Sequence, residues 1–234
     1  MSRIALEMAE IANLIGDVSR ANILAALMDG RALTALELSL AARVTPQTAS
    51  SHLAKLLDAN LLAVEKQGRH RYYRLASAHV ARTLEAVMAL TLSAPPRHRA
   101  KSRSDEDMRT ARMCYDHVAG RIGVGIADAM IARGHIAFEG DSGEVTDSGR
   151  AFFAELGVDL APPTKSRRVY CRSCLDWSER RPHIAGHVGA QIASFCFEKK
   201  WFARKAATRA LTITVQGVQM LPSAFGLDLH AEAL

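Results

Sequence analysis

The residues of this chain that could do chemistry are thiols and imidazoles in its second half. Cys171 and Cys174 form a Cys-x-x-Cys pattern, which can place two thiolates on one soft metal ion. A closed zinc site needs two more ligands, and the sequence has no second Cys-x-x-Cys. The candidates for these positions are Cys114, His117, His183 and His187. A redox pair and buried thiols without a chemical role stay open as alternatives.

An internal repeat surrounds these residues. The matched pairs, at one constant offset, are His117 with His183, Gly120 with Gly186 and Gly123 with Gly189. Each unit is predicted to be helix, hairpin, helix, an order that resembles a degenerate winged-helix half. A glycine inside a helix costs ~1 kcal/mol relative to alanine. We therefore expect the two glycine-bearing helices to approach closely, which would bring the two histidines near each other.

Between these helices the repeat predicts a pocket for a small effector, lined by the rings of Tyr115, Trp177 and Phe195. The candidate effector-binding residues lie at the start of the two repeats and are Cys114, Tyr115, His117, Cys174, Trp177 and His183. The candidate metal ligands overlap with them and are Cys171, Cys174, Cys114, His117 and His183. A repeat that serves only as a packing scaffold is the alternative.

The first half carries side chains suited to DNA on a predicted helix that begins after Thr45, a good N-cap, with Pro46 in its first turn. On a helical wheel its apolar residues share one face and its polar residues the other. Hydroxyls and amides can bond base edges, and a lysine can neutralise a phosphate. The candidate DNA contacts on this helix are Thr45, Gln47, Thr48, Ser50, Ser51, His52 and Lys55. An ordinary solvated helix face is the alternative.

A basic β-hairpin follows this helix. Apolar and alternating residues over 61–65 and 72–75 flank Gln67-Gly68, and glycine suits the turn. The candidate DNA contacts of the hairpin are Lys66, Arg69, His70 and Arg71. A short helix, a tight turn, a second helix and a basic hairpin in this order predict a winged helix-turn-helix, which puts one helix into the major groove.

Two further helices flank this predicted reading head. The first, over residues 1–15, repeats Ile4, Met8, Ile11 and Ile15 at helical spacing. The last has an apolar stripe, which consists of Val80, Leu84, Val87, Met88 and Thr91. Pairing both helices across a two-fold axis would bury their apolar faces, so the sequence predicts a homodimer that reads a palindrome.

Residues 4–92 resemble the ArsR/SmtB family of small winged-helix repressors, most sharply in Thr45-Pro-Gln-Thr-Ala-Ser-Ser-His-Leu and Gly68-Arg-His-Arg-Tyr-Tyr-Arg-Leu. The resemblance implies a homodimer that blocks a promoter until an effector releases it. It also raises metal or metalloid sensing, but the family's thiol motif has no counterpart in Leu36-Glu-Leu-Ser39. His79 and Glu85 have the wrong spacing for its last-helix zinc site. Sensing is therefore expected in the second half.

Length and charge set the outer bounds. The 234 residues suffice for one large domain or two small ones, and a net charge of +6 favours phosphate surfaces. The predicted domains are 1–94, a solvated linker 95–109, and an effector-sensing domain 110–234 with repeats 110–160 and 170–228. The expected fold class is mainly α with small β-hairpins (α+β). With no signal peptide and no run of ~20 apolar residues, we expect a cytoplasmic protein without membrane contact and with reduced thiols.

These patterns together predict a homodimeric DNA-binding transcriptional repressor, released from its operator by an effector in the C-terminal domain. The alternative is a metal- or metalloid-responsive repressor that uses the C-terminal Cys and His ligands. No nucleotide-binding loop, His-Glu-x-x-His motif or serine nucleophile elbow is present, so enzyme activity is not expected. The predicted partners are an operator duplex, a second copy of the chain and a small effector. No cofactor is expected other than a metal or metalloid ion.

Overall fold

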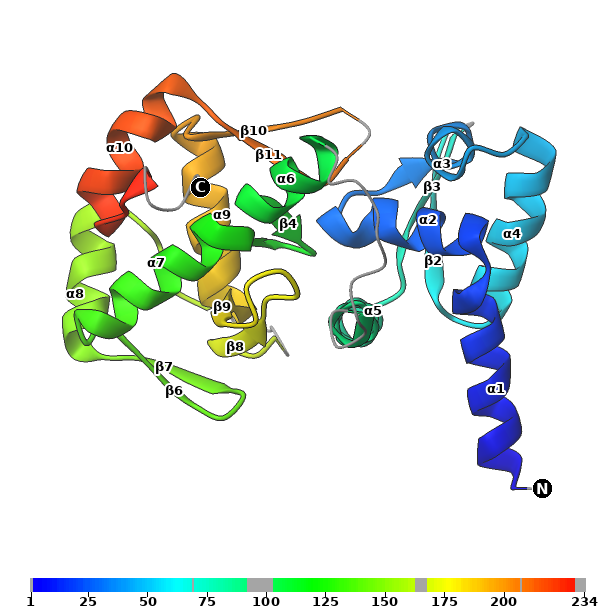
Figure 1. Ribbon diagram of the computed structural model, residues 1–234, viewed down its shortest axis with the longest axis horizontal. Coiled ribbons are helices and arrows are strands. Elements are labelled where there is room, and N and C mark those ends of the chain that lie inside the picture. Colours follow the sequence, from blue (N-terminus) through cyan, green and yellow to red (C-terminus); the bar gives the residue numbers. More distant parts are fainter. Residues whose placement is uncertain (1, 69, 92–102, 163–167, 207, 230–234) are drawn as a thin grey trace. The chain divides into compact units, whose positions relative to one another are not determined.

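The computed structural model describes residues 2–68, 70–91, 103–162, 168–206 and 208–229. Contacts between Cα atoms divide the chain into two compact units, Met1–Glu85 and Ala86–Leu234, which we call the N-terminal and C-terminal units (Figure 1). The fold mixes helices and strands, with a winged helix-turn-helix at the N-terminus.

The N-terminal unit is mostly helical with one small sheet. In chain order its elements are α1 (Arg3–Gly16), α2 (Val18–Ala26), the 3-10 helix η1 (Leu27–Asp29), β1 (Leu33–Thr34), α3 (Ala35–Ala42), α4 (Pro46–Asp58), β2 (Leu62–Gln67) and β3 (His70–Leu75), followed by α5 (Ala78–Thr91), which crosses the unit boundary. Helices α2, α3 and α4 pack around Ile23, Leu38 and Leu53, each at most 1% exposed. The strands form one antiparallel sheet in the order β1-β3-β2. The predicted helices and hairpin of this region are confirmed.

Helix α1 differs from the other helices of this unit because none of its residues is buried. It packs against α2. Among the described residues, no single helix has both the length and the apolar character to span a membrane. Two consecutive helices, Arg3–Gly16 and Val18–Asp29, are bent by 80° to each other. Taken together they have enough length and apolar composition, but neither has it alone.

The C-terminal unit alternates helices with short hairpins. After α5 its elements are α6 (Arg103–Thr110), β4 (Arg112–Cys114), β5 (His117–Ala119), α7 (Gly120–Ala132), β6 (Ile136–Glu139), β7 (Ser142–Val145), α8 (Asp147–Leu156), β8 (Arg172–Leu175), β9 (Pro182–Ala185), α9 (Gly186–Glu198), β10 (Phe202–Arg204), β11 (Leu211–Ile213) and α10 (Val215–Phe225). Strands β4 and β5 form one sheet, β6-β7-β8-β9 a second and β10-β11 a third. One apolar core joins both halves of the unit, with Ile122 and Phe153 from the first and Val188 and Phe225 from the second.

The predicted linker, 95–109, falls partly outside the described residues. Its residues 103–109 lie in helix α6, so the prediction of a linker is wrong for this part. Asp105 and Glu106 occupy the first turn of α6 and Arg109 the last. Acidic groups at the start and basic groups at the end of a helix interact favourably with its dipole, which explains how so charged a segment is helical. The predicted domain boundaries stay predictions.

The two halves of the C-terminal unit share local geometry. Helices α7 and α9 both have 13 residues, and each starts directly after a strand at a glycine with positive φ, 81° at Gly120 and 83° at Gly186. Helices α8 and α10 are both capped by a threonine hydroxyl, from Thr146 and Thr214, that accepts a backbone N–H. The same sequence signals therefore produce the same local structure twice.

Glycine is required at Gly123 and Gly189 for a reason other than the predicted close approach of two helices. A Cβ atom at Gly123 would lie 2.4 Å from the carbonyl oxygen of Val118, and one at Gly189 would lie 2.3 Å from that of Ile184. Each strand turns into its helix without a loop, so a strand carbonyl lies against the first helical turn. Glycine is needed because any side chain there would collide with backbone.

Candidate nucleic-acid interface and candidate metal centre

The helix-turn-helix consists of α3, a three-residue turn and α4. Arg43 takes a left-handed conformation, with φ 55°, that ends α3. The Thr45 hydroxyl then accepts the backbone N–H of Thr48, and Pro46 occupies the first turn of α4, as predicted. On α4, Ala49 and Leu56 are fully buried, so the opposite face of the helix is turned to solvent.

The predicted DNA contacts of α4 fall into two groups. Gln47, Ser51 and Lys55 lie on the exposed face, with Thr45 and Thr48 at its start. Two other predicted contacts, Ser50 and His52, have partners inside the protein. The exposed set offers an amide, hydroxyls and an ammonium group, which suit base edges and phosphates.

Ser50 and His52 differ from their neighbours. The Ser50 hydroxyl donates to the carbonyl oxygen of Pro46 at 2.9 Å, within its own helix. The half-buried His52 ring lies 3.5 Å from a guanidinium nitrogen of Arg20 on α2. These two side chains are partly engaged by the fold, because they lie at the edges of the polar face.

The wing is the hairpin of β2 and β3. Gln67 pairs with His70, and Lys66 pairs with Arg71, so the turn is only two residues long and Gly68 has φ 58°. Lys66, His70 and Arg71 are exposed. Arg69, the fourth predicted wing contact, lies outside the described residues. The exposed wing residues give the hairpin excess positive charge.

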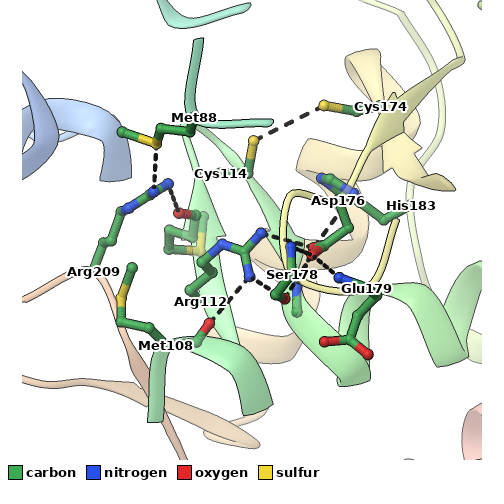
Figure 2. A network of polar contacts seen from close by, with 12 residues as sticks. Met88, Met108, Arg112, Cys114, Cys174, Asp176, Ser178, Glu179, His183 and Arg209 are labelled. Atoms are coloured by element: carbon green, nitrogen blue, oxygen red, sulfur yellow. Dashed lines mark hydrogen bonds and ion pairs between the residues drawn. The ribbon is translucent and has the colours of Figure 1, made fainter. Parts of the chain in front are cut away.

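Four buried side chains gather where two hairpins of the C-terminal unit meet. They are Cys114, His117, Cys174 and His183, and we call them the Cys/His cluster. The two sulfur atoms and one ring nitrogen of each histidine all lie within 4.8 Å of one another. The two sulfur atoms are 4.0 Å apart, as Figure 2 shows, and the imidazole rings stack with centroids 5.0 Å apart. The prediction that the two histidines lie near each other is confirmed.

Each hairpin contributes one thiol and one imidazole. Cys114 of β4 is the register partner of His117 of β5, and Cys174 of β8 is the register partner of His183 of β9. Directly opposed residues of an antiparallel pair have Cβ atoms ~4.5–5.5 Å apart on the same face. The strand register therefore sets the pairing of thiol with imidazole in both halves.

The two imidazoles have unsatisfied nitrogen atoms. His117 Nε2 and both ring nitrogens of His183 are buried without a hydrogen-bond partner among the described residues. A carboxylate lies on the other side of each ring: Asp116 is 3.1 Å from His117 Nδ1, and Asp176 is 3.8 Å from His183 Nδ1. Buried polar atoms are normally satisfied, so these nitrogens require an explanation.

The electrostatics of the Cys/His cluster favour a charged thiolate. Burial alone would lower the pKa of His117, but the hydrogen bond to Asp116 and the nearby Cys174 sulfur outweigh this and raise that pKa. The Cys114 thiol, followed by the two imidazoles, lowers the pKa of Cys174 against the effect of burial. The thiolate form of Cys174 is the form that binds metals.

Asp176 is held by a buried ion pair. Its carboxylate is 2.9 Å from the guanidinium of Arg112, and both side chains are 0% exposed. It also accepts the backbone N–H of Gly120, at the start of α7. Arg112 in turn donates to the Met108 carbonyl oxygen and the Ser178 hydroxyl (Figure 2). Burial would raise the pKa of Asp176, but the Arg112 charge and the other hydrogen bonds hold it well below its ordinary value.

Cys171, the other thiol of the Cys-x-x-Cys pattern, is not part of the Cys/His cluster. Cys171 lies in the bend directly before β8, whereas Cys174 lies on the strand itself, so the two thiols have different surroundings. Cys171 packs in the apolar core against Gly143, and burial raises its pKa to about 11. The prediction that Cys171 is a metal ligand together with Cys174 is therefore wrong.

The predicted aromatic lining of an effector pocket is occupied by other contacts. The Arg112 guanidinium stacks over the Trp177 ring at 4.3 Å. Phe195 packs edge-on against Trp201, with centroids 5.2 Å apart. Tyr115 lies half-buried in the turn between β4 and β5. These rings pack within the protein fold.

The space beside the two helical glycines is small. A cavity of about 10 Å³ lies between Gly123 and Gly189, which is room for one water molecule. Ligand pockets are typically ~300–1,000 Å³. An organic effector at this place stays a prediction that would require the two helices to move.

Sequence reasoning missed Arg112, Asp116 and Asp176, although a signal for them exists. The pattern Arg-x-Cys-x-Asp occurs twice, over 112–116 and over 172–176. On a strand, alternate residues share a face, so such a pattern can place a cation and a carboxylate beside a thiol. Its repetition would have pointed to the carboxylates that contact the imidazoles.

Comparisons with known proteins cover both units. A family model described as a helix-turn-helix domain matches residues 15–65. The HTH-type transcriptional regulator YdfF from Bacillus subtilis (strain 168) is 43% identical over 209 residues, 89% of this chain and 92% of the relative. Among solved structures, HlyU from Vibrio cholerae N16961 is 26% identical, covering 38% of this chain and 97% of its own at a TM-score of 0.35. The cadmium metal-sensor CMTR from Mycobacterium tuberculosis is 27% identical, covering 41% and 98% at a TM-score of 0.32.

Proposed function

The chain belongs to the helix-turn-helix transcriptional regulators, and we propose that this ArsR-type member is a homodimeric repressor that an effector releases from its operator. The observation that carries the proposal is the two-faced helix α4. Its apolar side holds the unit together through Ala49, Leu53 and Leu56, while Gln47 and Ser51 are exposed. A helix anchored on one side and polar on the other can enter the major groove without loss of fold.

The wing supplies the second contact. Lys66 and Arg71 lie opposite each other near the tip of a short hairpin, next in the chain after α4. Cations at this place would neutralise phosphates beside the groove and fix the register of α4 on the duplex. Affinity from the wing is independent of sequence, so base preference is assigned to α4.

The dimer partner is a second copy of the chain, seated on α1. Ile4 is 76% exposed and Met8 is 69% exposed, and nothing within the described part of the chain buries this face. Leu84 of α5 is only 4% exposed, so it belongs to the core of its own chain; Leu90, at 70% exposure, is available to a partner instead. An apolar helix face that self-associates across a two-fold axis also sets two reading heads at a fixed spacing.

Release is a population shift. The effector binds more tightly to a conformation in which the spacing of the two reading heads does not match the operator. The loss of operator affinity is limited by the ratio of the effector's affinities for the two conformations. We place the effector site in the C-terminal unit, whose two halves we interpret as repeats of one winged-helix-like unit. A metal-responsive repressor is the second candidate function, and the Cys/His cluster is the observation that favours it.

Selection of bound DNA tests the proposal. The full chain is incubated with sheared genomic DNA, and bound fragments are recovered and sequenced. We expect a palindromic site with half-sites about one helical turn, ~34–36 Å, apart. A double variant, Gln47→Ala with Ser51→Ala, is the control and should enrich the site poorly. Recovery of fragments without any shared sequence, from the wild type and the variant alike, would contradict the proposal.

A further inference from the structure

We propose that the Cys/His cluster binds one thiophilic metal ion of the Zn²⁺ class in a closed tetrahedral site. Its ligands are Cys114, His117, Cys174 and His183. Two thiolates and two imidazoles form a ligand set that Zn²⁺ and related soft ions prefer. Mg²⁺ and Ca²⁺ are excluded because they require oxygen ligands.

The dimensions of the cluster fit such an ion. In a tetrahedral site with Zn–S bonds of ~2.3 Å, two sulfur ligands lie about 3.8 Å apart. The sulfur atoms of Cys114 and Cys174 are 4.0 Å apart. All four ligand atoms lie within 4.8 Å of one another, so a contraction on the order of 1 Å completes the site. A disulfide is the poorer fit, because its sulfur atoms must come within ~2.05 Å.

The unsatisfied ring nitrogens are explained by the same ion. His117 is 2% exposed and His183 is 0% exposed, yet each has a ring nitrogen that no described group satisfies. A buried polar atom without a partner destabilises the folded state. A metal ion accepts the lone pair of a neutral imidazole nitrogen, so occupancy of the site removes this cost.

The carboxylates beside the rings have the geometry of outer ligands. A metal-bound histidine usually directs its other ring nitrogen to a carboxylate, which orients the ring and raises its basicity. Asp116 is placed 3.1 Å from Nδ1 of His117, leaving Nε2 for the metal. Asp176 lies 3.8 Å from Nδ1 of His183 and is held in place by Arg112. Both halves thus repeat one carboxylate–imidazole arrangement.

The charges of the site also balance with a divalent ion bound by two thiolates. Two thiolates offset a divalent cation, Arg112 offsets Asp176, and Arg168 offsets Asp116 at 2.5 Å. A group of buried charges with no net excess is the form that a protein interior tolerates best. Four protein ligands leave no open coordination position, so the ion has no catalytic role and ties the two hairpins together.

The metal site itself is independent of DNA binding, whereas its use as the effector site rests on the proposed function. Cys114 and His117 come from the first half of the C-terminal unit, and Cys174 and His183 from the second. An ion that bridges them couples the two halves. Because a site of this kind is assembled only in the folded chain, metal binding also stabilises the C-terminal unit.

Metal titration of the full chain tests the site without DNA. The protein is purified under reducing conditions without chelator, its metal content is measured by mass spectrometry, and the chelator-treated chain is titrated with Co²⁺. We expect one zinc per chain, and with Co²⁺ the intense visible absorption of a tetrahedral ion together with thiolate charge-transfer bands. No bound metal and no such Co²⁺ spectrum in the wild type would overturn the proposal, whatever the DNA experiments show.

Matched variants identify the ligands. Cys114→Ser and Cys174→Ser should lose the thiolate bands and the bound zinc, while Cys171→Ser and Cys196→Ser, which also change buried thiols, should keep both. Asp116→Asn should weaken zinc affinity about 10–100-fold, and Asp147→Asn, at a carboxylate 98% exposed, should not. The Asp116 variant keeps all four ligands, so it decides the case if a cysteine variant fails to fold. Loss of metal in Cys171→Ser but not in Cys174→Ser would overturn the assignment.

Discussion

The two units of this chain place their polar side chains in opposite ways. In the N-terminal unit the polar groups of α4 and the wing are exposed, with Gln47, Ser51 and Lys66 all turned to solvent. In the C-terminal unit the chemically active groups are buried, and Cys114 and His183 are 2% and 0% exposed. Exposed polar groups contribute little to stability and are free to contact a macromolecule. Buried ones must be satisfied within the fold, so they suit a ligand as small as an ion.

Buried and exposed ion pairs should therefore respond very differently to mutation. Arg112→Met leaves Asp176 buried without its cation and should lower the free energy of unfolding by about 3–5 kcal/mol. Both tryptophans, Trp177 and Trp201, lie in the C-terminal unit, so tryptophan fluorescence during denaturant unfolding follows that unit. Arg150→Gln, which breaks an ion pair with exposed side chains, is the control and should cost less than about 1 kcal/mol. Equal effects of the two variants would refute the contrast.

The exposed apolar face of α1 gives the next largest effect. Met8→Asp would bury a charge in the proposed dimer seam, so dimerisation should weaken about a hundredfold or more. Because Met8 is 69% exposed, the fold of each chain should stay intact. Sedimentation velocity over a concentration series measures both states, with Glu7→Gln on the same helix as control. If the wild-type protein is monomeric at micromolar concentration, α1 is not a dimer interface.

Two adjacent serines separate exposed from engaged hydroxyls on α4. Ser51→Ala should weaken binding to the selected site by about 1–3 kcal/mol and relax the base preference of the protein. Ser50→Ala should change little, because the Ser50 hydroxyl already donates to Pro46. Fluorescence anisotropy with the selected duplex and single-base variants measures the difference. If Ser50→Ala is the more damaging change, α4 presents a different face to the DNA.

The smallest effect belongs to the wing. Lys66→Ala should weaken binding to all DNA sequences equally. It should also reduce the slope of log affinity against log salt concentration by about 0.9, the value for one phosphate contact. The matched control is Lys199→Ala in the C-terminal unit. A change in base preference with Lys66→Ala would show that the wing reads bases as well as phosphates.

Local signals predicted the N-terminal unit well because its structure is built from short-range rules. Thr45 and Pro46 determine the start of α4, and Gly68 determines the wing turn, all from neighbours in the chain. The burial of Leu84 within its own chain could not be read in this way. Helical spacing shows that a face is apolar, but it does not show whether the chain or a second copy covers it.

The C-terminal unit was predicted less completely because its site depends on long-range pairing. The repeat correctly placed His117 near His183. The Cys-x-x-Cys pattern suggested that Cys171 and Cys174 act together, whereas Cys171, in the bend before β8, packs in the apolar core and Cys174 joins the Cys/His cluster. Cys174 instead meets Cys114, sixty residues earlier, through a contact that no local pattern encodes. The carboxylates Asp116 and Asp176 were visible only as part of the repeated Arg-x-Cys-x-Asp pattern.

The most direct test of the account is the affinity of the full chain, without added effector or metal, for its selected site relative to a scrambled duplex of equal length. Both are measured by anisotropy at the same salt concentration, because phosphate contacts alone bind any sequence. An exposed α4 that reads base edges predicts a preference of at least ~10³-fold for the selected site. Equal affinities for the two duplexes would contradict the claim that this chain reads DNA through α4.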